Sequence, residues 1–194
     1  MQLFLESDLQ FIFPAAWTVR KYDEHHFYHA LSGHGLKAVD FIALSPDGRL
    51  ILVEVKNYCP RMDQTGTPYP VVRKKASQLA ESLAKKYSDS LRAIRVVQQY
   101  YQRKWYYRLS YQLLRLLGSW GHFSELVFWN EAAKRSNHPI PVSIILWLET
   151  PKAAKKYRTK IYAHLTNHLD PAEAQLLLGG NGFSPLPDLR AHRK

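Results

Sequence analysis

Three charged residues, Asp40, Glu54 and Lys56, interrupt two otherwise apolar segments of the chain, AVDFIALS and RLILVEVKN. Charged residues are depleted in strands and are almost never fully buried unless they are paired. The two segments are joined by SPDGR, whose Pro, Asp and Gly are typical of a hairpin turn. A turn that sets Ser45 opposite Arg49 also sets Asp40 opposite Glu54, and Lys56 then points to the same side of the sheet.

This arrangement places two carboxylates close together. At a separation of about 5 Å and an effective dielectric of about 20 they repel each other by about 3 kcal/mol. A divalent cation removes the repulsion, and Mg²⁺ prefers carboxylate oxygens, water and phosphate as ligands. Lys56 could then orient or deprotonate an attacking water, or stabilise charge on a phosphate. The alternative is a solvated hairpin end in which Lys56 only neutralises the two acids.

The elements that would position these residues mix helical and strand patterns. Residues 3–13 have a helical apolar face that ends before Pro14, and residues 17–22 alternate as a strand does. The hairpin strands are expected at 36–44 and 49–56. The other predicted elements are helices at 71–87, 90–117, 123–135 and 152–168, a buried strand at 141–149 and a last short helix that begins at Asp170.

Asp40, followed by the triplet Glu54-Val55-Lys56 at the end of the next strand, resembles the motif of the PD-(D/E)xK nuclease superfamily. The order of the predicted elements is similar to that of its restriction-endonuclease-like fold. The resemblance implies an α/β protein whose core is a helix, a three-strand antiparallel meander, a helix and a further strand, with a helical insertion and a C-terminal helical extension. The sequence departs from the family's motif at Val39, where a proline is common.

On this interpretation residues 1–150 form the nuclease-like core, which includes the helical insertion at about 89–135. Residues 151–182 form the helical extension. Residues 183–194 form a basic tail, rich in proline at its start, that we expect to be mobile.

The resemblance also assigns roles to individual residues. It implies that Asp40, Glu54 and Lys56 are catalytic, and that Asp40, Glu54 and the backbone carbonyl of Val55 hold Mg²⁺, with Mn²⁺ as a substitute. Many members place a glutamate on the first helix as a further ligand, and Glu6 is the candidate for that position. In the resembling fold the helix after the motif borders the active site, so the candidate contacts with nucleic acid there are Lys74, Lys75 and Gln78.

The charge of the chain favours a polyanionic partner. The sequence has 27 Lys and Arg against 16 Asp and Glu, which gives a formal net charge of +11. The segment RVVQQYYQRKWYYRLSYQLLR interleaves basic side chains with aromatic rings that could stack on unpaired bases. Its helical spacing is more typical of a core or an oligomer contact, so a homodimer stays open. The candidate nucleic-acid contacts in this segment are Arg103, Lys104 and Arg108.

The remaining features narrow the class of protein. A single cysteine, Cys59, excludes an internal disulfide and a cysteine-based zinc site. The start MQLFLESDLQFIF has no basic region, so we expect no signal peptide. No apolar run is long enough to span a membrane, and we expect a cytoplasmic protein without a membrane partner.

Together these features predict a metal-dependent nuclease, an endonuclease-type phosphodiesterase that acts on nucleic acid, with DNA as the first candidate substrate and RNA as the second. One alternative is a non-catalytic nucleic-acid-binding protein of the same fold. The other is a subunit of a larger assembly, in which the aromatic segment docks a partner.

Overall fold

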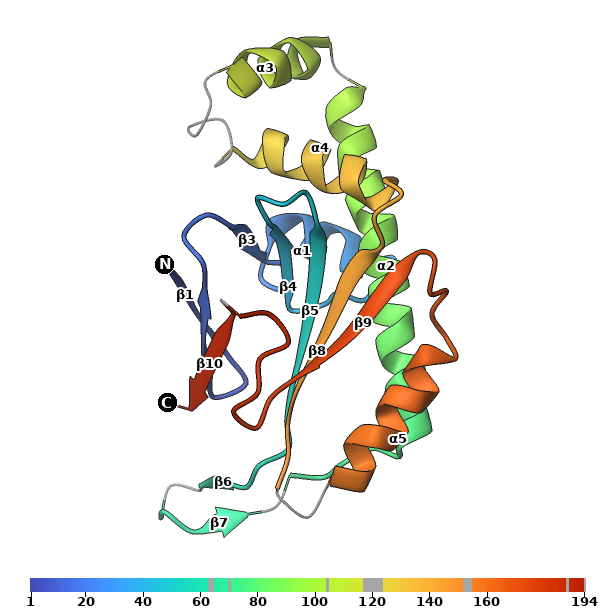
Figure 1. The fold of residues 1–194 in the computed structure, drawn as a ribbon. Helices are drawn as coiled ribbons and strands as arrows, with labels where there is room; N and C mark the ends of the chain where they lie inside the picture. The colour runs from blue at the N-terminus through green and yellow to red at the C-terminus, as the bar shows by residue number, and fades with distance from the viewer. Residues whose placement is uncertain are drawn as a thin grey trace.

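A five-stranded mixed sheet forms the centre of the fold (Figure 1). The structure is a computed structural model that describes residues 1–62, 65–69, 71–103, 105–116, 124–151, 155–187 and 189–193. The strands of the central sheet, in spatial order, are β3 (Thr18–Lys21), β4 (Phe41–Leu44), β5 (Leu50–Asn57), β8 (Val142–Glu149) and β9 (Ala174–Gly179). β3, β4 and β5 are antiparallel neighbours, whereas β8 and β9 continue the sheet in parallel to β5. The predicted α/β class is thereby confirmed.

The hairpin of β4 and β5 has the predicted register. Ile42 pairs with Leu52 and Leu44 pairs with Leu50, which is the register that sets Ser45 opposite Arg49. Gly48 supplies the positive φ of the turn, at 87°. The predicted strand 17–22 corresponds to β3, and the predicted strand 141–149 corresponds to β8.

Layers of different kinds cover the two faces of the central sheet (Figure 1). One face packs on helices, and the other packs on a three-stranded sheet. Alternation along β4 sends Ile42 and Leu44 to the helical side and Phe41 and Ala43 to the other side. The helices are α1 (His26–Ser32), α2 (Ala76–Gln102), α3 (Trp105–Leu116), α4 (Glu125–Ser136) and α5 (Lys155–Thr166). The three-stranded sheet consists of β1 (Gln2–Glu6), β2 (Leu9–Phe13) and β10 (Arg190–Arg193). A separate small hairpin is formed by β6 (Arg61–Met62) and β7 (Pro68–Tyr69).

The helix predicted at residues 3–13 is wrong, because this segment is the hairpin of β1 and β2. Ser7 and Asp8 form its two-residue turn with φ angles of 52° and 64°, as a tight hairpin requires. On β2, Leu9, Phe11 and Phe13 are buried, and the two residues between them are half-buried, which is a period of two. Packing of these side chains against the central sheet selects the strand.

The predictions for the C-terminal part are also corrected. No helix begins at Asp170; its side chain accepts a hydrogen bond from the backbone N–H of Ala172 in a turn that leads into β9. The tail that we expected to be mobile contains β10, which pairs antiparallel with β2. Leu189, just before β10, is fully buried between the two sheets. The end of the chain therefore completes the core.

The two helices predicted at 71–87 and 90–117 divide at a different place. α2 runs without a break from Ala76 to Gln102, and α3 follows it. Two polar residues in the middle of α2 hold the segment that leads into β4. The Ser90 hydroxyl accepts a hydrogen bond from the Val39 N–H at 3.0 Å, and Asp89 accepts one from the Lys37 N–H at 3.0 Å. These bonds fix the approach of the chain to Asp40.

Two further helix predictions are confirmed in the described residues. The helix predicted at 123–135 is α4, whose N-cap Ser124 accepts a hydrogen bond from the Val127 N–H. The helix predicted at 152–168 is α5. The segment between β3 and β4, which we expected to be a simple connection, contains α1. Within the described part of the chain, no helix is both long and apolar enough to cross a membrane.

The burial of the chain end can be tested by truncating one side chain. Leu189→Ala should lower the free energy of unfolding by about 2–5 kcal/mol, because it leaves a cavity between the two sheets. Leu3→Ala is the matched control, since Leu3 is 51% exposed on β1. Urea unfolding of the two variants measures the difference. A loss at Leu189 no larger than the loss at Leu3 would contradict the packed position of the tail.

Candidate functional site

Asp40, Glu54 and Lys56 lie together in one cavity, as the hairpin register predicts. The cavity has a volume of about 620 Å³ and lies where the sheet meets the first turns of α2. Asp40 stands just before β4, where its carbonyl accepts a hydrogen bond from the Tyr22 N–H at 2.8 Å. Glu54 and Lys56 are both on β5. The side chains come to one place because the strands are neighbours and their alternation is in phase.

Glu54 is the most enclosed member of the group. Its side chain has no exposed surface, and one of its oxygens, Oε1, accepts hydrogen bonds from two ammonium groups. The Nζ atoms of Lys56 and Lys86 lie 2.6 Å and 2.7 Å from it. Its second oxygen, Oε2, is buried and has no hydrogen-bond partner among the residues that the structure describes. A buried carboxylate is costly unless it is paired, so the two lysines are what makes this position tolerable.

Lys56 is held by two hydrogen bonds to its own strand. Besides Glu54, its Nζ donates to the backbone carbonyl of Val55 at 3.1 Å. Burial by itself would lower the pKa of Lys56, but the charge and hydrogen bond of Glu54 outweigh that effect and raise the pKa. Lys56 is therefore an ammonium group, which suits it to stabilise phosphate charge better than to remove a proton from water.

Asp40 differs from Glu54 in its surroundings. One oxygen, Oδ2, accepts a hydrogen bond from the Val55 N–H at 2.6 Å, and Oδ1 lies 4.0 Å from the Nζ of Lys86. Burial, together with the negative charge of Glu54, raises the pKa of Asp40 to about 7, although Lys86 and Lys56 oppose the rise. Burial and the neighbouring carboxylate of Glu54 thus both disfavour the charged form of Asp40.

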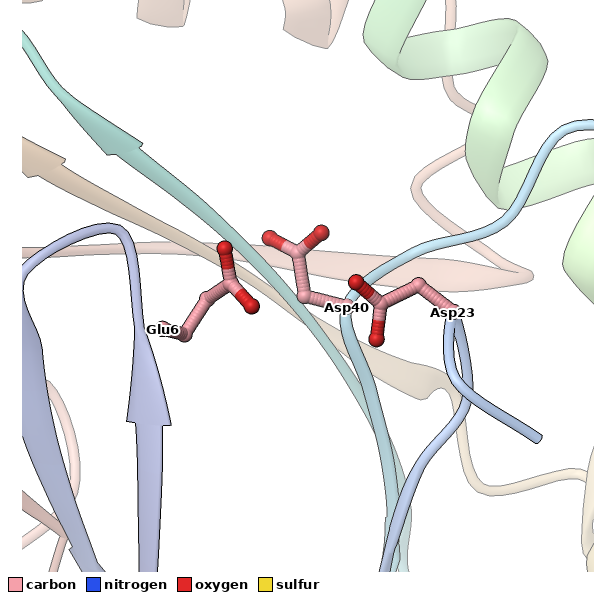
Figure 2. A group of neighbouring side chains, drawn as sticks. All are labelled: Glu6, Asp23 and Asp40. Carbon is pink, nitrogen blue, oxygen red and sulfur yellow. The ribbon is translucent and has the colours of Figure 1, made fainter.

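Two further acidic side chains, those of Glu6 and Asp23, lie close to Asp40. Glu6, Asp23 and Asp40 each offer a carboxylate oxygen, and these oxygens lie within 4.8 Å of one another (Figure 2). The predicted ligand Glu6 is brought to the site, but from the end of β1 rather than from a helix. Glu6 also pairs with Lys21 at 3.2 Å.

Sequence reasoning missed Asp23 and Lys86. Asp23 directly follows Tyr22, which pairs with Asp40, so the register between β3 and β4 would have pointed to it. Lys86 comes seven residues after Leu79 in a helix whose apolar stripe includes that leucine. A lysine at the spacing of the buried stripe indicates a charged side chain that points toward the core, and this pattern could have identified Lys86.

The predicted nucleic-acid contacts divide into two groups. Lys74 is exposed and lines the cavity, while Lys75 and Gln78 are exposed at the start of α2 and are not among the lining residues. Arg103 is exposed at the opposite end of α2, about 25 Å along the helix from Lys86 at 1.5 Å per residue. Lys104 and the side chain of Arg108 lie outside the described residues.

The aromatic segment also divides, into core and surface. Tyr101 is buried, with its ring 5.7 Å from that of Phe27. Trp105 is 66% exposed on α3, and Tyr106 is 42% exposed. Tyr101 therefore belongs to the core, whereas stacking of Trp105 and Tyr106 on bases stays a prediction.

The donor set at the cavity fits a hard divalent cation in part. Asp40 and the buried Oε2 of Glu54 are the kind of oxygen that Mg²⁺ and Mn²⁺ bind. The third implied ligand, the carbonyl of Val55, already accepts the ammonium of Lys56. Glu6 and Asp23 offer further carboxylate oxygens beside Asp40.

Comparisons of the chain with protein-family models, with curated proteins and with solved structures found no match. The fold and the site together define a mixed α/β protein with an acid–lysine cluster in an open cavity.

The raised pKa of Asp40 makes a prediction for stability. The folded protein holds a proton that the unfolded chain has released, so the free energy of unfolding should fall as the pH rises from about 4 to about 7. Asp40→Asn cannot ionise and lacks this contribution. Relative to the wild type it should become more stable by up to about 1.4 kcal/mol per pH unit over that range.

Urea unfolding in EDTA at several pH values measures this difference. The asparagine keeps an oxygen that can accept the Val55 N–H, so the comparison isolates the charge. A difference between the two proteins that stays constant from pH 4 to pH 7 would show that burial does not raise the pKa of Asp40.

Proposed function

We propose that this protein is a metal-dependent nuclease of the PD-(D/E)xK type that hydrolyses phosphodiester bonds in nucleic acid, with DNA as the first candidate substrate and RNA as the second. The observation that carries the proposal is the convergence of Asp40, Glu54 and Lys56 in one cavity, with two carboxylates and an ammonium group within reach of one substrate. The net charge of +11 supports it, because it would draw a polyanion to the surface.

The acidic and the basic residues at the cavity would have different roles. Asp40 and Glu54 would hold the cation, and the chemistry supplied by a bound Mg²⁺ would be Lewis-acid activation of water and of the scissile phosphate. Lys56 and Lys86 are ammonium donors that face the same cavity, so they would stabilise the negative charge that develops on the phosphate. Lys74, at the rim of the same cavity, would contact a flanking phosphate.

A second candidate function is nucleic-acid binding without cleavage. The observation that favours it is the closed pairing of Lys56, which contacts both Glu54 and the carbonyl of Val55. In this arrangement the acids and lysines neutralise one another. The positively charged surface of the protein would still bind nucleic acid, but this site would not cleave it.

The two functions are separated by cleavage assays on the intact protein. Wild type and Lys56→Met would be incubated with supercoiled plasmid, single-stranded DNA, branched DNA and RNA, in Mg²⁺, Mn²⁺ or EDTA. We expect metal-dependent cleavage by the wild type and a loss of about 10²–10³-fold in Lys56→Met, because a donor to the transition state is removed. Affinity for the same nucleic acid, measured by fluorescence anisotropy, should change little.

Lys85→Met is the matched control, since Lys85 is an exposed lysine of α2 that does not line the cavity. It should cleave as the wild type does. Equal cleavage by Lys56→Met and Lys85→Met would reject the assigned role of Lys56. Salt-sensitive binding by the wild type with no product in either metal would favour the second candidate.

A further inference from the structure

Two buried carboxylate oxygens at the cavity, Asp23 Oδ1 and Glu54 Oε2, lack a hydrogen-bond partner in the part of the chain that the structure describes. Both residues line the same cavity as Asp40. The Glu54 side chain is fully buried there. Buried polar atoms are nearly always satisfied, so orphaned oxygens on two acids in one cavity point to a bound cation.

The strand order places these two acids around Asp40. β4 lies between β3 and β5 in the sheet. Tyr22 donates its N–H to the carbonyl of Asp40 on one side, and Asp23 is the next residue along that chain. Glu54 is on β5, on the other side of Asp40. Asp40 thus lies between Asp23 on one side and Glu54 on the other.

Glu6 is held beside the same cluster by a contact between distant segments. The turn after β1 is tied to the end of β5, where the Asn57 side-chain amide donates to the carbonyl of Ser7 at 2.9 Å. Figure 2 shows the carboxylates of Glu6, Asp23 and Asp40 directed into one space, and their nearest oxygens lie within 4.8 Å of one another. Three carboxylates from three segments therefore converge.

Two of the oxygen atoms in the ligand residues that the family resemblance implies already accept hydrogen bonds from lysine side chains. The carbonyl of Val55 accepts the ammonium of Lys56 at 3.1 Å, and Glu54 Oε1 has two ammonium groups within 2.7 Å. A divalent cation at those atoms would meet positive charge at close range. Asp23 Oδ1, in contrast, has no hydrogen-bond donor within the described ranges.

We infer that Asp23 is a third carboxylate ligand of a divalent, oxygen-preferring cation, which it holds together with Asp40 and Glu6. Asp23 takes the place that the resemblance gives to the carbonyl of Val55. A role for this cation in cleavage rests on the proposed function, but its binding does not. Glu54, which also holds the cation in the proposed function, anchors Lys56 and Lys86 through Oε1, and its buried Oε2 has no hydrogen-bond partner within the described ranges.

The test is binding of Mn²⁺ alone to the full chain, measured by electron paramagnetic resonance of free Mn²⁺ and by isothermal titration calorimetry. Asp23→Asn keeps the size of the side chain and removes its charge. We expect it to weaken Mn²⁺ binding by about tenfold or more, as loss of a ligand or its close support typically does. Glu6→Gln should weaken binding in the same direction.

Glu24→Gln is the matched control. Glu24 is the adjacent acid, it is 68% exposed and it is not a member of the Glu6–Asp23–Asp40 group, although its partner Lys21 also pairs with Glu6. We expect this variant to bind Mn²⁺ as the wild type does. Thermal unfolding gives a second readout, because a ligand that binds only the folded state raises the melting temperature. Mn²⁺ should raise it in the wild type and in Glu24→Gln, and much less in Asp23→Asn.

The outcomes separate this inference from the nuclease proposal. Wild-type affinity in Asp23→Asn, with metal-dependent cleavage intact, would overturn the role of Asp23 and leave the nuclease standing. Weakened Mn²⁺ binding in Asp23→Asn, with no cleavage by the wild type, would support the cation site and reject the nuclease. A wild type that binds no Mn²⁺ at millimolar concentration would overturn the cation site outright.

Discussion

The burial of the Glu54 carboxylate is the constraint on which the rest of the site depends. A charge with no exposed surface is tolerated only when donors surround it, and here both donors are ammonium groups. Lys56 comes from the same strand, whereas Lys86 comes from α2, which packs over that face of the sheet. The pairing therefore links the sheet to the helix at the cavity. It also explains how a lysine can lie at the spacing of an apolar stripe, because its ammonium reaches the buried carboxylate of Glu54.

Asp40 shows the consequence of placing a second acid next to the first. Glu54 already has the two ammonium groups close to it, while the nearer of them to Asp40, that of Lys86, lies 4.0 Å away. Asp40 is left with a backbone donor, and its pKa rises to about 7 because of burial and the charge of Glu54. Further acids nearby, Glu6 and Asp23, increase the negative charge on this side of the cavity. A protein that keeps such a group together has to balance it with protons or with a cation.

The scaffold holds the group from several distant parts of the chain. Hydrogen bonds from the Val39 and Lys37 N–H groups to α2 fix the lead into β4, and the bond from Asn57 to Ser7 fixes the turn that carries Glu6. The three-stranded sheet that bears Glu6 is completed by β10, from the other end of the sequence. The positions of the acids thus depend on packing across the whole structure. Substitutions that disturb these distant contacts would therefore shift the acids at the cavity.

Sequence patterns were enough to predict the α/β class, the register of the central hairpin and the shared side of Asp40, Glu54 and Lys56. Those features follow from alternation along single strands and from one turn, which are local rules. Tertiary structure alone decided that residues 3–13 form a hairpin and that the chain end forms a strand, because their apolar residues fit more than one period until they pack on the central sheet. The same holds for Glu6, Asp23 and Lys86, whose positions depend on contacts between segments far apart in the chain. Long-range packing has no signature in a local pattern, so a single sequence could name the catalytic candidates and could not show which charges surround them.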